Sequence, residues 1–355
     1  MVKRYDRLYE KIVDFNNLLF AYKQTTKGSR KFKRDAILFS MVEDVNLFNL
    51  WKELKTGVYR VGDYIRFKVY EPKERLVSAP HIRDKIVQFA VHNVIKDVYK
   101  GVFTKDSYAC LEGRGTHRAV EAVQRYMRMA ERNFGGGWIV KVDISKFFYT
   151  IDREILKRIL RKKIACERTL WLLDTIIDSS PEGKVGIPLG NVTSQDFANI
   201  YLNELDQYVK RYLGIKYYVR YMDDCIAIVP TREDAKLLKE RMIWFLRTKL
   251  NLKENEKKTQ IFPLKQGVNA YGFKIWTTHR KVRDQSKRAM KRRIKAMDRK
   301  LKEGLLTEKE VKQAVDSWLG HARHSNSYNL AKKIFAPYPY IKVEGEMKFG
   351  EWRCD

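Results

Sequence analysis

Cysteine is scarce in this 355-residue sequence, and its few copies form no recognisable pattern. No two of them have the C-x-x-C spacing of zinc knuckles and thiol redox sites, and their wide separation suggests no disulfide framework. His321 and His324 have the helical spacing of a metal-ligand pair, but no third ligand lies near them in the sequence. We therefore expect packing or phosphate contact from these histidines rather than zinc binding. The cysteines are Cys110, Cys166, Cys225 and Cys354.

Long apolar runs are also absent. No stretch approaches the roughly eighteen apolar residues that a membrane-spanning helix needs. Residues 1–6 lack the apolar segment of a secretory signal. We therefore expect a cytoplasmic protein with no membrane partner. Hydrophobic residues still make up 44% of the chain, which is ample for the cores of two or three packed subdomains.

Acidic residues are few relative to basic ones. The chain has 43 Asp and Glu against 72 Lys and Arg, which gives a formal net charge of +29 and a pI near 9.8. An excess this large lies outside the ordinary range for a soluble enzyme and indicates a polyanionic partner. Nucleic acid is the expected partner, since nothing in the sequence indicates a membrane.

Two adjacent carboxylates stand between two β-prone runs in residues 217–229. β-branched and aromatic residues flank Asp223 and Asp224, and this pattern predicts a hairpin that presents both side chains at an exposed tip. Adjacent carboxylates repel each other, so a cation is their natural partner, and Mg²⁺ prefers carboxylate oxygen. The alternative is a pair of solvated turn residues, which is the commoner role of Asp.

A third carboxylate, Asp143, belongs to residues 138–148, in which apolar and polar positions alternate. The alternation predicts a strand with Val142 facing a core and Asp143 on the opposite, polar face. The alternative for Asp143 is a helix N-cap, but Asp152 stands directly before the next predicted helix and is the better cap. A binding partner is the explanation left for Asp143.

A strand Asp followed at a distance by an Asp-Asp hairpin resembles the palm of polymerases, and the Tyr-Met-Asp-Asp run at 221–224 resembles the form that many reverse transcriptases use. The resemblance covers about residues 15–335. It implies an α+β right-hand polymerase with fingers, a palm built on an antiparallel sheet, and a helical thumb. The implied parts are fingers at 1–100 with 153–185 returning to them, palm at 101–152 and 186–276, basic thumb at 277–335, and a C-terminal tail at 336–355, compatible with a short hairpin.

The same resemblance implies the catalytic groups. Asp143, Asp223 and Asp224 would hold two Mg²⁺ ions, with the backbone carbonyl of Ile144 as a further ligand. One ion would activate the primer 3′-hydroxyl, and the other would escort the triphosphate. Lys258 lies in a Lys-Lys-Thr run that matches the family's motif D and would protonate the leaving pyrophosphate. Its alternative is an ordinary solvated lysine.

Two predicted strands, 64–70 and 74–79, flank a Pro-Lys turn that resembles the fingers hairpin of group II intron and retroelement enzymes. The resemblance implies that Lys73 and Arg75 hold the triphosphate of the incoming nucleotide, with Arg75 the more important. The alternative is a solvated turn. Phe148 stands where the family places the residue that excludes a ribose 2′-hydroxyl, and strand alternation would place Phe147 in the core instead.

Residues 186–202 form a Gly- and Pro-containing loop that opens a long helix, and Gly190 allows the backbone to lie flat against a base pair. Most reverse transcriptases carry Gln where Leu189 stands and a Ser-Pro where Gln195 follows Ser194. This departure resembles the enzymes of diversity-generating retroelements, which copy a template RNA with errors concentrated at adenines. We therefore expect Leu189, Gly190 and Gln195 to contact the nucleotide, with packing as the alternative for Leu189.

Three further stretches indicate nucleic-acid contact. The Gly-punctuated basic loop around Arg114 lacks the G-K-[ST] ending of a P-loop and resembles the family segment near template and primer. Tyr271 and Gly272 open a run that resembles the primer grip. The chain from Lys281 onward predicts an amphipathic helix whose cationic face would contact the phosphate backbone. Its candidate contacts are Arg288, Lys291, Arg292, Arg293 and Lys295.

The resemblance therefore implies an RNA-directed DNA polymerase that makes cDNA from a structured template RNA. Its expected partners are the template RNA, the RNA/cDNA duplex, deoxynucleoside triphosphates and a small basic accessory protein. The first interpretation is the low-fidelity enzyme of a diversity-generating retroelement. One alternative is a bacterial antiphage reverse transcriptase that copies a dedicated non-coding RNA, and another is a non-catalytic RNA-binding protein on a polymerase scaffold.

Overall fold

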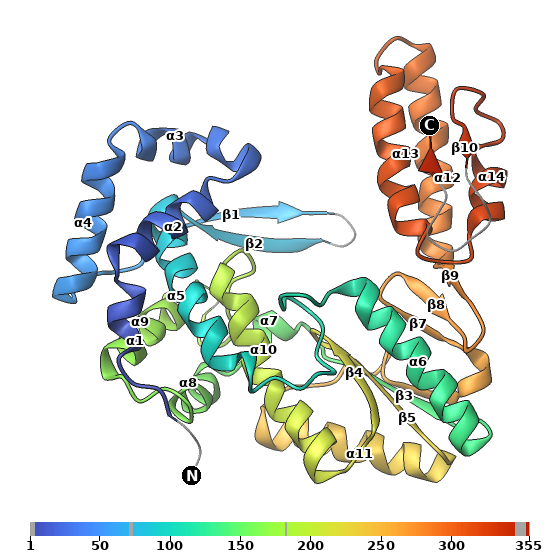
Figure 1. Cartoon of the computed structure of the whole chain (residues 1–355), viewed down its shortest axis with the longest axis horizontal. Helices are drawn as coiled ribbons and strands as arrows, with labels where there is room; N and C mark the ends of the chain where they lie inside the picture. The colour runs from blue at the N-terminus through green and yellow to red at the C-terminus, as the bar shows by residue number, and fades with distance from the viewer. Residues whose placement is uncertain (1–3, 71–73, 182, 345–352, 355) are drawn as a thin grey trace.

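The computed structural model describes residues 4–70, 74–181, 183–344 and 353–354. The chain forms an N-terminal group of helices with a hairpin, a four-stranded sheet flanked by helices, and a C-terminal helical unit that stands apart from the N-terminal group (Figure 1). No helix in these described ranges is long and apolar enough to cross a membrane.

Two separate helices occupy residues 34–56 of the N-terminal region. Helix α3 (Arg34–Ser40) ends before α4 (Glu43–Thr56) begins. The side-chain amide of Asn46 donates to the Phe39 carbonyl at 2.9 Å, and two acidic residues in the first turn of α4 favour a helix N-terminus there. The preceding helices are α1 (Leu8–Ile12), α2 (Phe15–Thr25) and η1 (Gly28–Phe32).

The predicted hairpin follows. Strands β1 (Tyr64–Val69) and β2 (Arg75–Pro80) pair antiparallel, within one residue of the predicted bounds. The hairpin projects from the N-terminal helices toward the C-terminal unit (Figure 1). Two long helices come next, α5 (Ile82–Lys100) and α6 (Thr116–Phe134).

The central sheet is antiparallel, with the strand order β4-β5-β3-β6. Its strands and the main helices beside it are β3 (Trp138–Asp143), β4 (Tyr217–Tyr221), β5 (Asp224–Val229), β6 (Gln260–Pro263), α10 (Val192–Gln207), η2 (Tyr208–Tyr212) and α11 (Arg232–Lys249). The predicted polar face of β3 is wrong, because both faces are buried. Val142 packs in a core with α10 and α11, whereas Ile139 packs in a second core with α6. Lys141 and Asp143 are 9% and 5% exposed.

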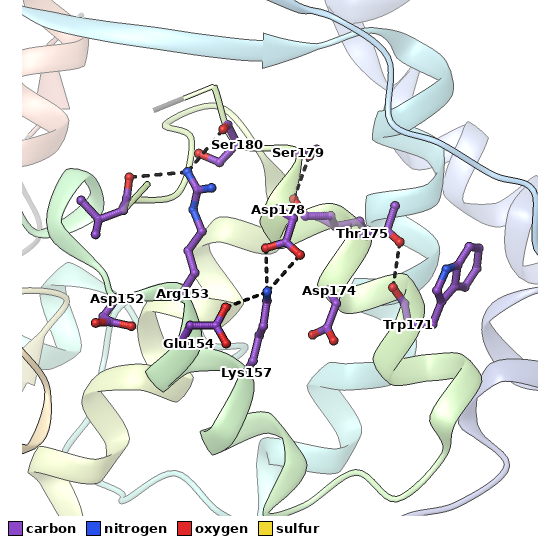
Figure 2. A network of polar contacts seen from close by, with 12 residues as sticks. Asp152, Arg153, Glu154, Lys157, Trp171, Asp174, Thr175, Asp178, Ser179 and Ser180 are labelled. Carbon is purple, nitrogen blue, oxygen red and sulfur yellow. Dashed lines mark hydrogen bonds and ion pairs between the residues drawn. The ribbon is translucent and has the colours of Figure 1, made fainter. Parts of the chain in front are cut away.

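Three helices lie between β3 and α10. They are α7 (Phe147–Thr150), α8 (Arg153–Arg161) and α9 (Glu167–Asp178). Asp152 caps α8 as predicted, since its Oδ1 accepts from the Ile155 N–H at 3.0 Å. Lys157 of α8 joins this helix to α9, because its Nζ lies 2.7 Å from Asp178 (Figure 2). The same Nζ lies 2.9 Å from Glu154 within α8.

The C-terminal part combines a small sheet with a helical unit. Its elements are η3 (Leu264–Gln266), β7 (Val268–Ala270), β8 (Phe273–Ile275), β9 (Arg280–Val282), α12 (Asp284–Lys302), α13 (Glu308–Ala322), α14 (Tyr328–Phe335), β10 (Val343–Glu344) and β11 (Arg353–Cys354). Strands β10 and β11 pair antiparallel, in agreement with the hairpin expected in the tail. The second core continues from α6 and the sheet into this unit, where Met290 and Ile294 are 3% and 1% exposed.

Candidate active site and nucleic-acid interface

The two adjacent carboxylates occupy different places on the β4–β5 hairpin. Tyr221 pairs with Asp224, so the tight turn consists of Met222 and Asp223, and Asp224 begins β5. The predicted exposed tip is therefore wrong, since both carboxylate residues are half-buried. Met222 has φ 53°, a left-handed conformation that costs a non-glycine residue roughly 1–2 kcal/mol. Strain of this kind clusters at functional sites.

Asp143 lies directly opposite Asp224 on the neighbouring strand β3. Directly opposed residues in an antiparallel pair point to the same face of the sheet. A lysine holds each carboxylate: Asp143 Oδ2 lies 2.6 Å from Lys258 Nζ, and Asp224 Oδ2 lies 3.1 Å from Lys141 Nζ. The strand register thus unites two of the predicted aspartates with Lys258. It also brings in Lys141, a residue that the sequence analysis did not single out.

The surroundings of the hairpin disfavour negative charge. Burial raises the pKa of Asp224 to about 6, although Lys141 lowers it in part and Asp143 raises it further. Burial also raises the pKa of Asp223, against the opposing charges of Lys258 and Arg75. Arg75 therefore lies within electrostatic reach of Asp223, which connects the fingers-type hairpin to the carboxylates.

The fit of a divalent cation depends on the oxygen atoms that are free. In the described part of the chain, no group of three or more His, Cys, Asp or Glu side chains has the geometry of a metal site. Even so, the Oδ1 atoms of Asp143 and Asp224 are buried and have no hydrogen-bond partner among the described residues. Such carboxylate oxygens are ligands that a hard divalent cation prefers, so the donor set fits Mg²⁺.

Ile144, whose carbonyl is the expected further ligand, forms an antiparallel backbone bridge with Glu254. That bridge is closed by two hydrogen bonds, from Asn255 N–H to the Asp143 carbonyl at 2.7 Å and from Ser145 N–H to the Lys253 carbonyl at 2.9 Å. Neither bond uses the Ile144 carbonyl.

Arg220 holds the hairpin from behind, and the sequence reasoning assigned it no role. Its side chain is fully buried, and Nε and Nη2 each lie 2.7 Å from one oxygen of the Asp206 carboxylate. Its Nη1 donates to the Met222 carbonyl at 3.2 Å, at the strained turn. One available signal was an arginine within a β-prone apolar run, because such a charge is buried only with a partner.

The residues expected at the nucleotide come together around β2. The Leu189 carbonyl accepts from the Ser78 N–H at 2.8 Å, so the loop from 186 to 190 lies along β2, which Arg75 begins. Gly190 has φ +129°, and a Cβ there would lie 2.6 Å from the Ser78 carbonyl oxygen. Only glycine allows this close approach. Lys73, the other expected triphosphate ligand, lies outside the described residues.

Phe148 lies beside the same loop, but its secondary structure differs from the prediction. Phe147 and Phe148 lie in the helical turn α7, not in a strand, so the alternation argument is wrong. Phe147 is nevertheless buried and Phe148 half-buried, and the Phe148 carbonyl accepts from the Ile187 N–H at 2.8 Å. Gln195 is exposed on the first turn of α10, and its side chain has no hydrogen bond within the described ranges.

Arg114 stabilises its own loop through hydrogen bonds to backbone carbonyls. Its Nη1 donates to the carbonyls of Thr104, at 2.6 Å, and Ser107, at 2.5 Å. The guanidinium therefore closes the loop before α6. A nucleic-acid contact by Arg114 stays a prediction, with the remaining guanidinium nitrogens as its donors.

Tyr271 and Gly272 form the two-residue turn between β7 and β8, and both have positive φ, 50° and 92°. Positive φ at both positions is the pattern of a type I′ hairpin turn. The Tyr271 hydroxyl donates to the Asp224 carbonyl at 3.3 Å, and a Cβ on Gly272 would lie 2.8 Å from His321 of α13. The turn thus links the carboxylate strand to the C-terminal helices.

The basic face of α12 is exposed as predicted. The helix buries Met290 and Ile294 and leaves its cations on the outer side. His321 stacks on Phe273 with ring centroids 4.3 Å apart, and His324 stacks on His117 at 3.6 Å, so both histidines pack. The exposed cations include Arg288, Lys291, Arg292, Arg293 and Lys295.

Comparison with known proteins agrees with the family resemblance seen in the sequence. Residues 68–283, more than half of the chain, match the family described as reverse transcriptase (RNA-dependent DNA polymerase). The protein YkfC of Escherichia coli is 27% identical over 74% of this chain and 79% of its own length. The group II intron-encoded protein LtrA of Lactococcus lactis is 24% identical over 63% of this chain, but the match spans only 48% of LtrA.

Solved structures show the fold. A telomerase structure from Candida tropicalis has a TM-score of 0.51 and 13% identity, covering 81% of this chain and 58% of the telomerase chain. One from Candida albicans has a TM-score of 0.50 and 11% identity, covering 80% and 58%. The predicted right-hand polymerase fold is confirmed. With more than half of its length matched, the chain belongs to the reverse transcriptase family.

Proposed function

We propose that this protein is an RNA-directed DNA polymerase that makes cDNA from a structured template RNA. The observation that carries the proposal is the register that sets Asp143 opposite Asp224, with Asp223 in the adjoining turn. Nucleotidyl transfer needs negatively charged ligands on a rigid support next to a surface that holds a polyanion. The chain supplies both, since the exposed basic face of α12 is linked to the carboxylate strand through the β7–β8 turn.

Asp143, Asp223 and Asp224 would hold two Mg²⁺ ions, with the Ile144 carbonyl as a further ligand. Bound there, the ions would supply charge stabilisation for the primer 3′-hydroxyl and the leaving pyrophosphate. Lys258 would move from Asp143 toward the pyrophosphate and donate a proton to it. Burial raises the pKa of Asp224 to about 6, so a bound cation would favour its ionised form.

The parts of the polymerase follow from this site. Fingers would comprise residues 1–100 with 153–185, palm 101–152 with 186–276, and thumb 277–335, before the tail. Lys73 and Arg75 would hold the triphosphate at the fingers hairpin, while Leu189, Gly190 and Gln195 would contact the nucleotide. Phe148 would lie under the sugar and exclude a 2′-hydroxyl.

Two surfaces would hold the nucleic acid. Arg114, Tyr271 and Gly272 would approach template and primer. The α12 cations, Arg288, Lys291, Arg292, Arg293 and Lys295, would contact the phosphate backbone of the RNA/cDNA duplex.

Low fidelity in a diversity-generating retroelement is the finer form of the proposal. Its support is Leu189, an apolar residue whose carbonyl accepts from Ser78 of β2, the strand that Arg75 begins. In that setting a small basic accessory protein would accompany the enzyme. Neighbouring genes would separate this role from antiphage defence, because a template repeat with a matching variable gene belongs only to the retroelement.

The test is primer extension on an RNA template with deoxynucleoside triphosphates and Mg²⁺, together with sequencing of the nucleic acid that copurifies. Template-directed extension supports the proposal. Tight RNA binding without extension, in protein whose fold is intact, would leave a non-catalytic RNA-binding protein and refute the polymerase.

A further inference from the structure

A basic pocket lies beside the carboxylates, and of the cations that line it only Lys258 has a role in the chemistry described so far. It has a volume of about 210 Å³ and is bounded by β3, β6, the β7–β8 hairpin and the residue before α12. No carboxylate is among the described residues that line it. The residues that define the basic pocket are Lys141, Lys257, Lys258, Asn269, Lys274 and Arg283.

Three cations of the basic pocket are free to bind a ligand. Lys257, Lys274 and Arg283 form no ion pair in the described part of the chain. Lys274 Nζ lies over the Trp276 ring, 4.9 Å from its centroid. Lys274 and Arg283 are half-buried, which separates them from ordinary solvated lysines and arginines. Unpaired cations around a small hollow attract a compact anion.

The other two cations are shared with the carboxylates. Lys141 Nζ lies 3.1 Å from Asp224 and 2.7 Å from the Asn269 carbonyl, and Lys258 Nζ lies 2.6 Å from Asp143. Each ammonium group therefore stands between a carboxylate and the basic pocket. An anion in the pocket and the carboxylates compete for the same two charges.

We propose that the basic pocket binds one phosphate-class anion and that this anion draws Lys141 and Lys258 away from the carboxylates. The source of the anion rests on the proposed function: it is either a phosphodiester near the primer end or the pyrophosphate product. Both present the same tetrahedral oxyanion. By linkage, whatever removes the lysines from the carboxylates strengthens anion binding, and the reverse also holds.

The first experiment measures binding of inorganic pyrophosphate to metal-free protein by calorimetry, so it does not depend on DNA synthesis. We expect saturable binding at one site that Lys274→Gln weakens about tenfold, the loss of one charge-assisted hydrogen bond. The matched control is Lys281→Gln, because Lys281 is the cross-strand neighbour of Lys274 and lies outside the basic pocket. Absence of saturable binding, or an equal loss in both variants, would overturn the proposal.

The second experiment tests the sharing of lysines. Asp224→Asn frees Lys141 from its carboxylate, and Asp143→Asn frees Lys258, so each variant should bind pyrophosphate about threefold to tenfold more tightly. Circular dichroism establishes that each variant is folded, and two variants guard against failure of one. Unchanged or weaker binding in folded variants would contradict the shared charges.

The third experiment identifies the source. If one neutral methylphosphonate near the primer end removes the effect of Lys274→Gln on duplex affinity, the anion is a primer phosphate. If duplex affinity is unaffected but pyrophosphate inhibits extension about tenfold less well, the anion is pyrophosphate. If neither effect occurs, the pocket has no place in the reaction and the proposal fails. Intact pyrophosphate binding with no extension by the wild type would count against the polymerase alone.

Discussion

Arg220 and Asp206 form a fully buried ion pair directly behind the strained turn that carries Asp223. Their side chains are 0% exposed, and two hydrogen bonds of 2.7 Å join the guanidinium to the carboxylate. The same guanidinium donates to the Met222 carbonyl at 3.2 Å. The pair therefore fixes the turn from inside the protein and leaves its outer side for chemistry.

Breaking this pair should destabilise the protein strongly. In Arg220→Met, Asp206 keeps its buried charge without its partner, so the free energy of unfolding should fall by about 3–5 kcal/mol. The double variant Arg220→Met with Asp206→Leu should lose less than the single variant, because no buried charge is left. Urea unfolding followed by circular dichroism measures both.

The control for that comparison is an exposed pair. Lys253 and Glu256 lie 3.5 Å apart with side chains 70% exposed, so Glu256→Gln should change stability by less than about 1 kcal/mol. A double variant as unstable as Arg220→Met would contradict the charge argument and point to lost packing volume.

Part of this site could be predicted from the sequence, because the signals for that part are local. Asp143 was recognised from alternation within one strand, and Asp223 and Asp224 from a hairpin pattern. Lys141 and Arg220 received no role, because the partner of Lys141 is set by strand register and the partner of Arg220 lies on the packed helix α10, and no local pattern encodes either contact. The same limit explains α7, where β-prone residues adopt a helical turn as the loop after β3 pairs with residues 253–255.

Asp223→Asn should abolish DNA synthesis while RNA affinity stays within about twofold, because the change removes a ligand charge but no phosphate contact. The amide is nearly isosteric, so the half-buried turn should keep its fold. Single-nucleotide extension with Mg²⁺ and filter binding of RNA measure the two properties. Asp63→Asn is the control, since Asp63 is an exposed aspartate away from the hairpin. Extension retained by the Asp223 variant would refute the palm assignment.

Asp224 should make the metal-free protein less stable as pH rises. Its folded pKa of about 6 lies above the ordinary value of about 3.9. The folded state therefore binds more protons than the unfolded state between those values, and stability falls as pH increases from about 4 to 6. Asp224→Asn should raise the free energy of unfolding at pH 7 by about 1–3 kcal/mol and flatten this slope. Urea unfolding in chelator at several pH values tests it, and a destabilised variant would contradict the sign.

Neutralising Arg288, Arg292 and Arg293 should weaken RNA/DNA duplex binding and reduce the slope of log affinity against log salt. Each lost phosphate contact removes about 0.9 from the slope on a duplex, because fewer counterions are released. Fluorescence anisotropy between 50 and 200 mM salt, the range over which such contacts are resolved, measures the slope.

The matched control for the α12 variant is Lys236, Lys239 and Arg241 changed to Gln on α11, a helix that packs in the other hydrophobic core of the central sheet. It removes the same total charge and should leave the slope nearly unchanged. Equal slopes in the two triple variants would mean that net charge, rather than the α12 face, holds the duplex.

Leu189→Gln should raise fidelity. Glutamine there can donate and accept hydrogen bonds near the nascent base pair, so a mispair that displaces those partners leaves polar groups unpaired and costs about 1–3 kcal/mol. Leucine imposes no such penalty, since apolar contact tolerates a displaced base. The variant should therefore discriminate against misincorporation opposite template adenine up to roughly tenfold to a hundredfold better.

Steady-state insertion of each nucleotide opposite adenine measures this ratio, and Leu189→Met, which conserves volume without adding a polar group, should leave it unchanged. The side chain is half-buried and its carbonyl is tied to Ser78, so the backbone should stay in place in both variants. If misincorporation is the same in Leu189→Gln while activity and folding persist, Leu189 serves only packing, and the low-fidelity proposal loses its chemical support.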